Sequence, residues 1–363
     1  MPSHLDAVLP LAGAWFLRSG IQEPEGGVAR YYLTDSGRNA RISTEITGYT
    51  VSALVYLYRR LDDFEYLEAA RRAASFLARR AWNRELAVFP FEYSTNGPLP
   101  SNLAYFFDSG IIVRGLLTLW RVTPEGEWLD TAVATGRSMM RDFVNADAVH
   151  PVVSLPSRAP LPHAGNWSKN PGCYQLKAAL AWYDLYEVTS DRAFLEAYER
   201  VLAKSLETHR DFLPGEQDPA LVMDRLHAYC YFMEGLLPRY ADPLCAAAVR
   251  EGIARVSALL REIAPVFERS DVCAQLLRVR LFADRLGVEP LDRSAAHEEV
   301  ERIQRYQFAD SDRARHGGFW FGTREGRLLP YVNPVSTAFC MQALEMWRLA
   351  EAGEFKPNRH ELI

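Results

Sequence analysis

Residues 327–347 read RLLPYVNPVSTAFCMQALEMW, and this stretch indicates how the chain folds. Tyr331, Asn333 and Ser336 stand at the start of an apolar run that is broken only by small or polar residues at helical spacing. Asparagine is a favoured N-cap residue, and a helix that is apolar on most of its circumference must be covered on most sides. The stretch therefore predicts a buried helix with polar and aromatic groups at its N-terminus.

Five other stretches have the same apolar character, so the helix of residues 327–347 belongs to a series. Three glycines near the starts of these stretches, Gly48, Gly110 and Gly172, follow one another at intervals of 62 residues. A repeat on this scale is typical of arrays built from one supersecondary unit. The five stretches read EITGYTVSALVYLY, FFDSGIIVRGLLTLW, KNPGCYQLKAALAWY, MDRLHAYCYFMEGLL and RSDVCAQLLRVRLF.

A second series of helices alternates with the apolar series and is amphipathic. FEYLEA, GEWLDT and RAFLEA share an aromatic residue, a leucine and an acid, and the acid falls in the first turn, where the positive helix end favours it. Arginine and glutamate make up the polar faces. The predicted amphipathic helices lie near residues 3–20, 64–82, 126–144, 190–210, 242–263 and 291–307.

Six apolar helices paired with six amphipathic ones predict an all-α fold, an (α/α)6 toroid or barrel of six helical hairpins. We expect one domain over residues 1–363, with the apolar helices in an inner ring. An open solenoid of hairpins is the alternative, but the chain length and the number of pairs favour closure. GGVARYYL and GGFWFG predict minor short strands in loops at the rim.

Composition excludes several kinds of protein. Hydrophobic residues make up 48% and charged residues 24%, as in a globular chain. The net charge of −5, without a basic block, predicts no nucleic-acid partner and no membrane-surface partner. There is no run of ~18 apolar residues for a membrane span. The first residues lack the basic region of a secretory signal, so we expect a cytoplasmic protein.

Short motifs exclude several chemistries. GxGxxG, GxxxxGK[ST], HExxH and GxSxG are all absent from the sequence. The eight histidines are scattered, and the five cysteines form no CxxC pair, which indicates reduced thiols. We therefore expect no cofactor and assign no metal ligands, while the presence of a metal ion in the cleft and the oligomeric state stay open.

Carboxylates at the helix starts are the candidates for catalysis. In the expected toroid the inner helices run the same way, so their N-termini and the long connecting loops share one face. Asp108 follows Tyr105, Phe106 and Phe107, and this aromatic surrounding predicts a raised pKa that suits a general acid.

Glu45 and Asp271 are the candidate partner bases for Asp108. The structural alternative for each of these acids is a helix cap or a first-turn acid without a catalytic role.

The aromatic and neutral polar residues near these starts predict a sugar-binding cleft. Tyr49, Trp167, Trp320 and Tyr331 would stack on sugar rings. Asn170, His227, Asn333 and Arg324 would hold hydroxyl groups or a uronate carboxylate, although His227 could equally be a core histidine. The full set of candidate substrate-binding residues is Tyr49, His163, Trp167, Asn170, Tyr174, His227, Trp320, Arg324, Tyr331 and Asn333.

Two residue types in these helices have a plainer explanation. Trp128, in the amphipathic helix expected at 126–144, is expected to be a core residue. Gly48, Gly110 and Gly172 could simply allow the apolar helices to pack closely.

The six hairpins, the YLEAA-type outer helices and the acid beside glycine resemble the six-hairpin glycosidase superfamily of carbohydrate-active enzymes. The resemblance extends to the toroids of N-acylglucosamine 2-epimerases and glucuronyl C5-epimerases, and it implies a carbohydrate site at the inner-helix rim. Unsaturated glucuronyl hydrolases use aspartates at inner-helix starts, and Asp108 matches such a position. Its context reads FDSG where a double aspartate is expected.

Other toroid classes fit less well. The resemblance implies a pair of histidines for the 2-epimerases, and His227 has no partner on the final apolar helix, which argues against that reaction. HGGFWFG resembles the glycine-aromatic repeats of terpenoid cyclases, but the DxDD motif is missing, and Asp62 and Asp63 stand between an inner and an outer helix. The terpenoid-cyclase hypothesis ranks third.

The leading hypothesis is a glycoside hydrolase that acts on an oligosaccharide or a uronate-containing glycan. Asp108 would be the general acid, with Glu45 or Asp271 as the base that activates water. A separation of ~6.5–9.5 Å between the working carboxyls would indicate inversion, and ~5 Å retention. The alternatives are a uronate lyase or sugar epimerase, and a toroid that binds glycans without catalysis.

Overall fold

The computed structural model describes residues 4–93, 101–145, 149–163, 166–309 and 311–363. Its α-helices are α1 His4–Arg18, α2 Thr44–Leu61, α3 Phe64–Ser75, α4 Phe106–Trp120, α5 Gly126–Phe143, α6 Gln175–Thr189, α7 Arg192–Phe212, α8 Pro219–Gly235, α9 Pro243–Ile263, α10 Ser270–Arg285, α11 Arg293–Gln304 and α12 Pro334–Glu351. The strands are β1 Tyr32–Leu33, β2 Arg38–Asn39, β3 Ile42–Ser43, β4 Glu92–Tyr93, β5 Leu103–Tyr105, β6 Val152–Ser154, β7 Phe267–Arg269, β8 Gly322–Arg324, β9 Arg327–Leu328 and β10 Tyr331–Val332. Short helical turns occur at Phe76–Ala81, Trp167–Lys169 and Leu237–Arg239. All twelve predicted helices are present.

The chain divides into two compact units, which are described one at a time. Unit 1 consists of Met1–Ile21, Tyr31–Arg38 and Thr208–Ile363, and unit 2 consists of Gln22–Arg30 and Asn39–Glu207. The boundary between the last segments of the two units falls inside α7.

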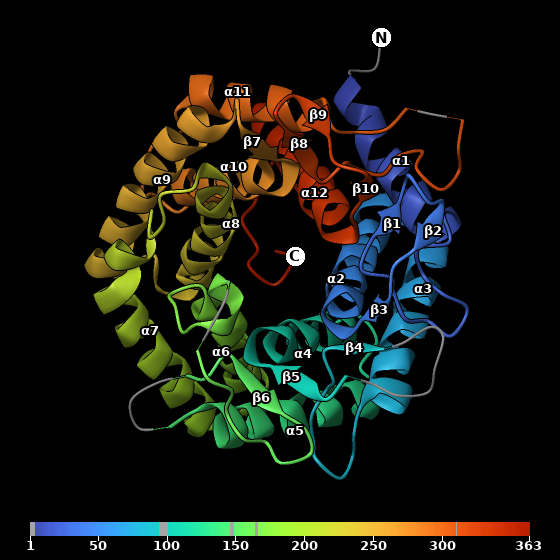
Figure 1. Ribbon diagram of the computed structural model, residues 1–363, viewed down its shortest axis with the longest axis vertical. Helices are drawn as coiled ribbons and strands as arrows, with labels where there is room; N and C mark the ends of the chain where they lie inside the picture. The colour runs from blue at the N-terminus through green and yellow to red at the C-terminus, as the bar shows by residue number, and fades with distance from the viewer. Residues whose placement is uncertain (1–3, 94–100, 146–148, 164–165, 310) are drawn as a thin grey trace. The chain divides into compact units, whose positions relative to one another are not determined.

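In unit 2, the apolar helices α2, α4 and α6 pack side by side, and α3 and α5 cover them on one side (Figure 1). Thirteen of the fifteen residues of α4 are buried, against eight of the eighteen residues of α5. A helix buried around its circumference needs neighbours on most sides, whereas an amphipathic helix buries a single stripe. The predicted alternation of the two series is therefore confirmed here, and Trp128 of α5 is a core residue, as predicted.

Three glycines allow the apolar helices of unit 2 to approach closely. A Cβ atom added to Gly48 would lie 2.9 Å from the Cα of Ile112, and one added to Gly110 would lie 2.4 Å from the carbonyl oxygen of Ala178. A Cβ on Gly115 would lie 2.4 Å from the carbonyl oxygen of Gly48. These distances are far inside van der Waals contact. The packing role predicted for Gly48 and Gly110 is confirmed, and it brings the first turns of α2, α4 and α6 together.

In unit 1, the apolar helices α8, α10 and α12 form a corresponding row, with α9, α11 and α1 packed against it (Figure 1). Arg278 in the middle of α10 is fully buried and bonds Glu234 of α8 at 2.6 Å and Gln342 of α12 at 2.9 Å. The Cys340 thiol, early in α12, contacts the carbonyl of Ser270 at the start of α10. These contacts join α10 to α8 on one side and to α12 on the other.

Short strands fix where several apolar helices begin. β3, β5, β7 and β10 each end at or just before the first residue of α2, α4, α10 and α12. They pair with β4, β6, β8 and β1, respectively, in antiparallel register. Each pairing holds the chain just before the helix N-terminus, where the candidate carboxylates stand. The two predicted strand segments are confirmed in outline, since GGVARYYL contains β1 and GGFWFG leads into β8.

The helix that contains residues 334–347 begins as its sequence predicts. Asn333 is the N-cap of α12, and its Oδ1 accepts hydrogen bonds from the N–H groups of Val335 at 2.7 Å and Ser336 at 3.3 Å. The capping explanation thus holds for Asn333. Asp62 and Asp63 are caps as well, at the end of α2 and the start of α3.

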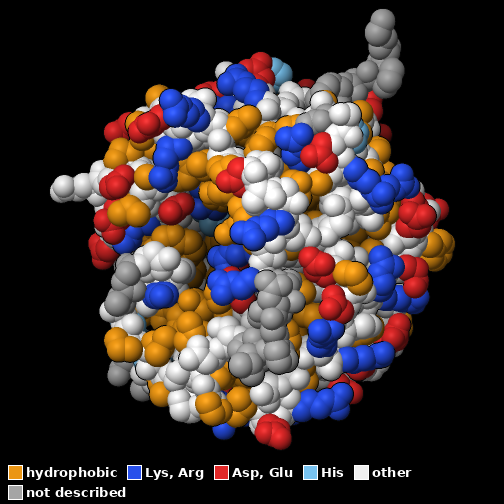
Figure 2. Space-filling view, turned by 45° about the vertical axis from the view of Figure 1, so that its right-hand side comes forward, with side chains coloured by type: hydrophobic (Ala, Val, Ile, Leu, Met, Phe, Trp, Pro, Cys, Tyr) orange, Lys and Arg blue, Asp and Glu red, His pale blue; other side chains and the backbone are white. Residues whose placement is uncertain are grey.

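The surface carries both signs of charge. Basic and acidic side chains are interspersed over the face shown in Figure 2, with apolar side chains between them. None of the described helices is both long enough and apolar enough to cross a membrane.

Candidate functional site

Two carboxyl groups meet at the start of the apolar helices of unit 2. Glu45 is the second residue of α2 and Asp108 the third residue of α4, and these helices touch through Gly48 and Ile112. Asp108 is 6% exposed, whereas Glu45 is half-buried and keeps contact with solvent. Asp108 Oδ2 is buried and has no hydrogen-bond partner among the described residues. A buried oxygen without a partner is costly unless the carboxyl is neutral or meets a ligand.

The environment makes both carboxyls weaker acids than usual. Burial raises the pKa of Glu45 to about 7, although the positive charge of Arg30 opposes the shift. Burial, followed by the negative charge of Glu45, raises the pKa of Asp108 well above its ordinary value. The raised pKa predicted for Asp108 is confirmed. A proton can therefore reside on this pair near neutral pH, as general acid–base chemistry requires.

Arg30 is the cation of this cluster, and it was not among the predicted site residues. Its guanidinium lies 3.0 Å from Glu92 Oε1 and 5.1 Å from the ring centroid of Phe91. The second oxygen of Glu92 pairs with Arg41 at 2.8 Å. Arg30 stands in a loop and Glu92 in a two-residue strand, so neither belongs to a periodic pattern from which a sequence could reveal its position.

Three tyrosines stand at or near the starts of α2, α4 and α6. Tyr49 of α2 is buried, and Tyr105 precedes α4. Tyr174 stands just before α6, and its hydroxyl donates to the carbonyl of Asn170 at 3.0 Å. Burial raises the pKa of Tyr105 and of Tyr174, so both phenols stay neutral. Tyr49 and Tyr174 offer little ring face for a sugar, because both side chains are almost fully covered.

The loop before α6 holds three more of the predicted binding residues. His163 is exposed, and its ring lies 6.4 Å from that of His150. Trp167 is half-buried, and its ring lies nearly perpendicular to that of Tyr174, with the ring centroids 4.9 Å apart. The amide of Asn170 donates to the carbonyl of Asn166 at 3.0 Å. Trp167 keeps part of its ring accessible, and its stacking role remains a prediction.

A second charged cluster stands at the start of α10 in unit 1. Arg269 donates to both oxygens of Asp271, at 3.0 and 2.7 Å, and to Asp224 at 2.8 Å. Its guanidinium also lies 4.5 Å from the ring centroid of Phe321. Although burial opposes it, the charge of Arg269 keeps the pKa of Asp271 below its ordinary value. Asp271 is therefore an ionised, fully paired carboxylate, which makes it a weaker candidate for a base than Glu45.

His227 belongs to the same cluster. It is 7% exposed, and its Nδ1 lies 2.7 Å from Gln275 Oε1 and 3.7 Å from Asp271. Burial lowers the pKa of His227 to about 4, so the imidazole is neutral at physiological pH. Both oxygen neighbours favour a proton on Nδ1, which leaves Nε2 as the basic nitrogen. The core-histidine alternative and a catalytic role are both compatible with this arrangement.

The remaining predicted residues of unit 1 differ in accessibility. Tyr331 is half-buried, with ring contacts to Tyr31 at 5.2 Å and Phe321 at 5.1 Å. Arg324 is exposed and covers the Phe267 ring. Trp320 is only 9% exposed and packs against an aromatic neighbour, so most of its ring faces the core. Tyr331 is consequently a better stacking candidate than Trp320.

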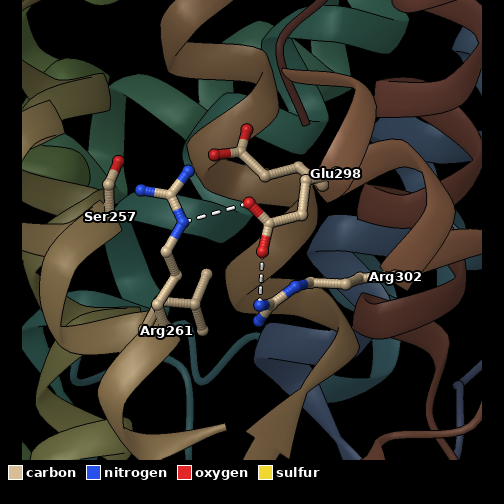
Figure 3. Close-up of a pocket in the computed structure, with 6 residues that line it drawn as sticks. Ser257, Arg261, Glu298 and Arg302 are labelled. Atoms are coloured by element: carbon tan, nitrogen blue, oxygen red, sulfur yellow. Dashed lines mark hydrogen bonds and ion pairs between the residues drawn. The ribbon is translucent and has the colours of Figure 1, made fainter. Parts of the chain in front are cut away.

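A small cavity lies between α9 and α11 of unit 1, away from these residues. Its volume is about 10 Å³, which is room for one water molecule. Arg261 and Arg302 both donate to Glu298 at its edge (Figure 3). The cavity is too small for a sugar. Within either unit taken by itself, no three described His, Cys, Asp or Glu side chains lie close enough together to share a metal ion.

Comparisons with known proteins give similarity at the level of structure. No family model and no curated protein sequence matches the chain. A sugar epimerase from a ruminal bacterium matches with a TM-score of 0.73 and 14% identity, over 94% of this chain and 98% of the other. Cellobiose 2-epimerase from Spirochaeta thermophila matches with a TM-score of 0.71 and 16% identity, over 96% and 100%.

A glycosaminoglycan-degrading unsaturated glucuronyl hydrolase from a Bacillus species matches with a TM-score of 0.67 and 13% identity, over 96% of this chain and 98% of the other. At such low identity, a structural likeness establishes the fold and leaves the activity open. The matches extend over nearly the whole length of every chain compared. The resemblance to six-hairpin proteins is therefore confirmed as a resemblance of fold, and the chain has the (α/α)6 toroid fold.

Proposed function

We propose that this protein is a carbohydrate-active enzyme that transfers protons through Glu45 and Asp108. The observation that carries the proposal is the carboxyl pair itself, in which both pKa values are raised and one buried oxygen of Asp108 has no partner in the described chain. Perturbed acids that gather at one point of a scaffold are typical of acid–base catalysis. Structural neighbours that are themselves carbohydrate enzymes support a sugar as the substrate.

The reaction that we propose is epimerisation or isomerisation of a sugar, in place of the hydrolysis favoured by the sequence. A pKa of about 7 suits Glu45 to a reversible proton transfer, because a base near the operating pH can both take and return a proton. Asp108, whose pKa burial raises well above its ordinary value, would in its protonated form donate to the oxygen that gains charge. Two of the structures compared above are sugar epimerases, which supports this choice.

The sequence argued against epimerisation because a second histidine is missing, and a carboxyl pair could take the place of the histidine pair. His227 has no histidine partner on α12, so a mechanism that needs two histidines lacks one of them. In our proposal, Glu45 and Asp108 carry out the transfer, and His227 is a further candidate base rather than an essential member of a pair.

Solvent deuterium exchange tests the proposal. A panel of reducing mono- and disaccharides is incubated with the protein in D₂O and followed by NMR. We expect deuterium to enter the carbon next to the carbonyl of one sugar, together with a change of stereochemistry or of carbonyl position. Glu45→Gln and Asp108→Asn should each lower the rate by about 10²–10⁴-fold.

Glu127→Gln is the matched control, because Glu127 belongs to an exposed ion pair in the same unit. The proposal fails if both carboxyl variants keep the full rate on a sugar that the wild type converts. It also fails if the wild type exchanges no sugar of the panel.

Glycoside hydrolysis is the second candidate, and the same carboxyl pair supports it. Protonated Asp108 would act as the general acid on the glycosidic oxygen, and ionised Glu45 as the base or nucleophile. New reducing ends from oligosaccharides or unsaturated uronates, without deuterium on carbon, would favour this reaction. Tight binding of one glycan without any turnover would instead favour a non-catalytic binding protein.

A further inference from the structure

Two hydrogen-bond acceptors lie on one face of α8 in unit 1. Asp224 and His227 are three residues apart on this helix, and residues at that spacing are neighbours on a helix surface. The side chain of Asp224 is 37% exposed, so its carboxylate can be reached from outside. α8 packs beside α10 (Figure 1), and residues of β7 and α10 hold both acceptors in place.

Arg269 of β7 anchors the carboxylate of Asp224. Its Nη1 donates to Asp224 Oδ1 at 2.8 Å, while Nε and Nη2 donate to the two oxygens of Asp271 at 3.0 and 2.7 Å. The guanidinium is also seated 4.5 Å from the ring centroid of Phe321. These contacts fix Asp224 Oδ1, and Asp224 Oδ2 makes no hydrogen bond to a described residue. Oδ2 is therefore a positioned acceptor for a molecule from outside.

Gln275 of α10 fixes the tautomer of His227. Gln275 Oε1 lies 2.7 Å from His227 Nδ1, and Asp271 Oδ2 lies 3.7 Å from the same nitrogen. An ionised carboxylate can only accept a hydrogen bond, so the proton of the neutral imidazole belongs on Nδ1. Nε2 then carries the lone pair, and it makes no hydrogen bond to any described residue. His227 thus presents a second positioned acceptor.

A buried donor without a partner stands beside these acceptors. Gln275 is fully buried, and its Nε2 has no hydrogen-bond partner among the described residues, although its Oε1 is bonded to His227. A buried N–H group without an acceptor is costly. An oxygen atom from outside the described chain would remove that cost. This independent observation indicates that a bound molecule completes the polar groups between α8 and α10.

An aromatic surface adjoins the same cluster. The Phe321 ring, on which the Arg269 guanidinium is seated, lies 5.1 Å from the ring of Tyr331, and Tyr331 lies 5.2 Å from the ring of Tyr31. All three rings are half-buried, so each keeps part of its surface accessible. An aromatic face next to positioned polar groups is typical of sites that stack on a sugar ring and bind its hydroxyl groups.

We propose that Asp224 and Nε2 of His227 form a subsite for two hydroxyl groups of a neutral sugar, whose ring stacks on Tyr331. Arg269 and Gln275 are the positioning residues that aim the two acceptors. The choice of a sugar as the ligand rests on the proposed function, whereas the two fixed acceptors are a property of the folded unit 1.

The chemistry of the subsite favours a neutral sugar over a uronate. Both acceptors match hydroxyl groups, which can donate. A uronate carboxylate has no proton to donate and would be repelled by the negative charge of Asp224. The guanidinium fork of Arg269, which could otherwise bind a carboxylate, is already occupied by Asp271.

Equilibrium binding tests the subsite without any turnover. D-Glucose, D-mannose and cellobiose are titrated against the protein, with D-glucuronate and D-galacturonate as the charged counterparts, and ligand-observed NMR follows binding. We expect a neutral sugar to bind, and both uronates to bind at least about 10-fold more weakly. Asp224→Asn turns an NH2 group outward and should weaken binding by about 10–100-fold, and His227→Phe by about 3–10-fold.

Glu251→Gln is the matched control for Asp224→Asn, because Glu251 forms a surface ion pair with Arg210 in the same unit. The control should leave the affinity unchanged. The subsite is overturned if none of the neutral sugars binds, or if neither Asp224→Asn nor His227→Phe weakens the binding. Tighter binding of the uronates, lost in Arg324→Gln, would overturn it as well.

Nitrogen NMR of the His227 ring gives a readout that needs no ligand. Near neutral pH, the wild type should have its proton on Nδ1. Gln275→Leu removes the nearer acceptor, so a larger share of the other tautomer should appear and the affinity should fall by about 3–10-fold. A wild-type ring with its proton on Nε2 would overturn the proposal, as would unchanged ring signals in Gln275→Leu.

Failure of the subsite can be told apart from failure of the proposed function. Sugar binding that depends on Asp224 and His227, without deuterium exchange into any sugar, rejects the proposed function and supports the subsite. Deuterium exchange by a protein whose sugar affinity is the same in Asp224→Asn and His227→Phe rejects the subsite alone.

Discussion

Asp108 in unit 2 and Asp271 in unit 1 stand in the same place, the first turn of an apolar helix that follows a short strand. Both oxygens of Asp271 receive guanidinium N–H groups, whereas Asp108 Oδ2 has no partner in the described chain. The pKa of Asp271 is lowered and that of Asp108 is raised. Burial is common to both, so the difference comes from the neighbouring charges: the positive charge of Arg269 acts on Asp271, whereas the negative charge of Glu45 acts on Asp108. An unpaired buried acid can exchange a proton, and a bidentate one is held as an ion.

The largest effect is expected where this pairing is broken in unit 1. Arg269→Met leaves Asp271 and Asp224 without their cation, so the free energy of unfolding should fall by about 3–5 kcal/mol near neutral pH. Denaturant unfolding measures this loss. Arg79→Met, which breaks an exposed ion pair, is the control and should change little. If the two variants unfold alike, Asp271 does not depend on Arg269.

Glu299 of α11 is an intermediate case that sharpens the comparison. It is 5% exposed and accepts one hydrogen bond from Arg280 at 2.8 Å, while its second oxygen has no partner among the described residues. Burial raises the pKa of Glu299 from 4.5 to about 7. A single bond to arginine thus fails to keep a buried carboxyl strongly acidic.

A raised pKa in the folded state means that the protonated form of Glu299 is favoured there. The associated stability is fully present below pH 4.5 and is lost as the pH rises through about 7. Glutamine cannot ionise, so Glu299→Gln should not lose unfolding free energy as the pH rises. Between about pH 4.5 and pH 8, the variant should gain about 3 kcal/mol in unfolding free energy relative to the wild type. A difference that is independent of pH would contradict the assignment.

The pH-dependent contribution of Glu45 to the unfolding free energy should have the same sign as that of Glu299 and be smaller. Its pKa is also raised from 4.5 to about 7, so its stabilising contribution is lost over the same pH range. Because the side chain is half-buried, solvent screens part of the effect, and Glu45→Gln should gain about 2 kcal/mol over that range. Thermal melting at several pH values measures it. A gain larger than that of Glu299→Gln would reverse the expected order.

The pH-dependent contribution of Asp271 to the unfolding free energy should have the opposite sign and be the smallest of the three. Its pKa lies below 3.8 in the folded protein, so it contributes stability above pH 3.8 that is lost as the pH falls through the lowered value. The difference in unfolding free energy between Asp271→Asn and the wild type should therefore become smaller only under strongly acidic conditions. A difference that changes most near pH 7 would mean that Asp271 is not held as an ion.

The helices and their two series could be predicted because burial leaves a periodic trace in the sequence. The sequence of α4 is apolar around the whole helix and that of α5 on one face only, and the structure shows this contrast in burial. The 62-residue spacing of Gly48 and Gly110 indicated a repeat, and the packing role considered for these two glycines is confirmed by the structure. Carboxyls at helix starts were also identifiable, because capping positions follow from the helix boundaries.

The cations could not be predicted in the same way. Arg30 lies in a loop and Arg269 ends a three-residue strand, so no periodicity relates either of them to its carboxylate. Their pairing depends on strand register and on contacts between residues far apart in the chain. Sequence reasoning consequently ranked Asp271 with Glu45, and only the paired guanidinium separates the two.

The close approach at Gly48 and Gly110 links the spacing of the two acids to the helix backbones themselves. Glu45 is three residues before Gly48, and Asp108 is two residues before Gly110. A methyl group at Gly110 would meet the Ala178 backbone at 2.4 Å, so α4 would have to move away from α6. A larger side chain at Gly110 would therefore displace the first turn of α4, and with it Asp108.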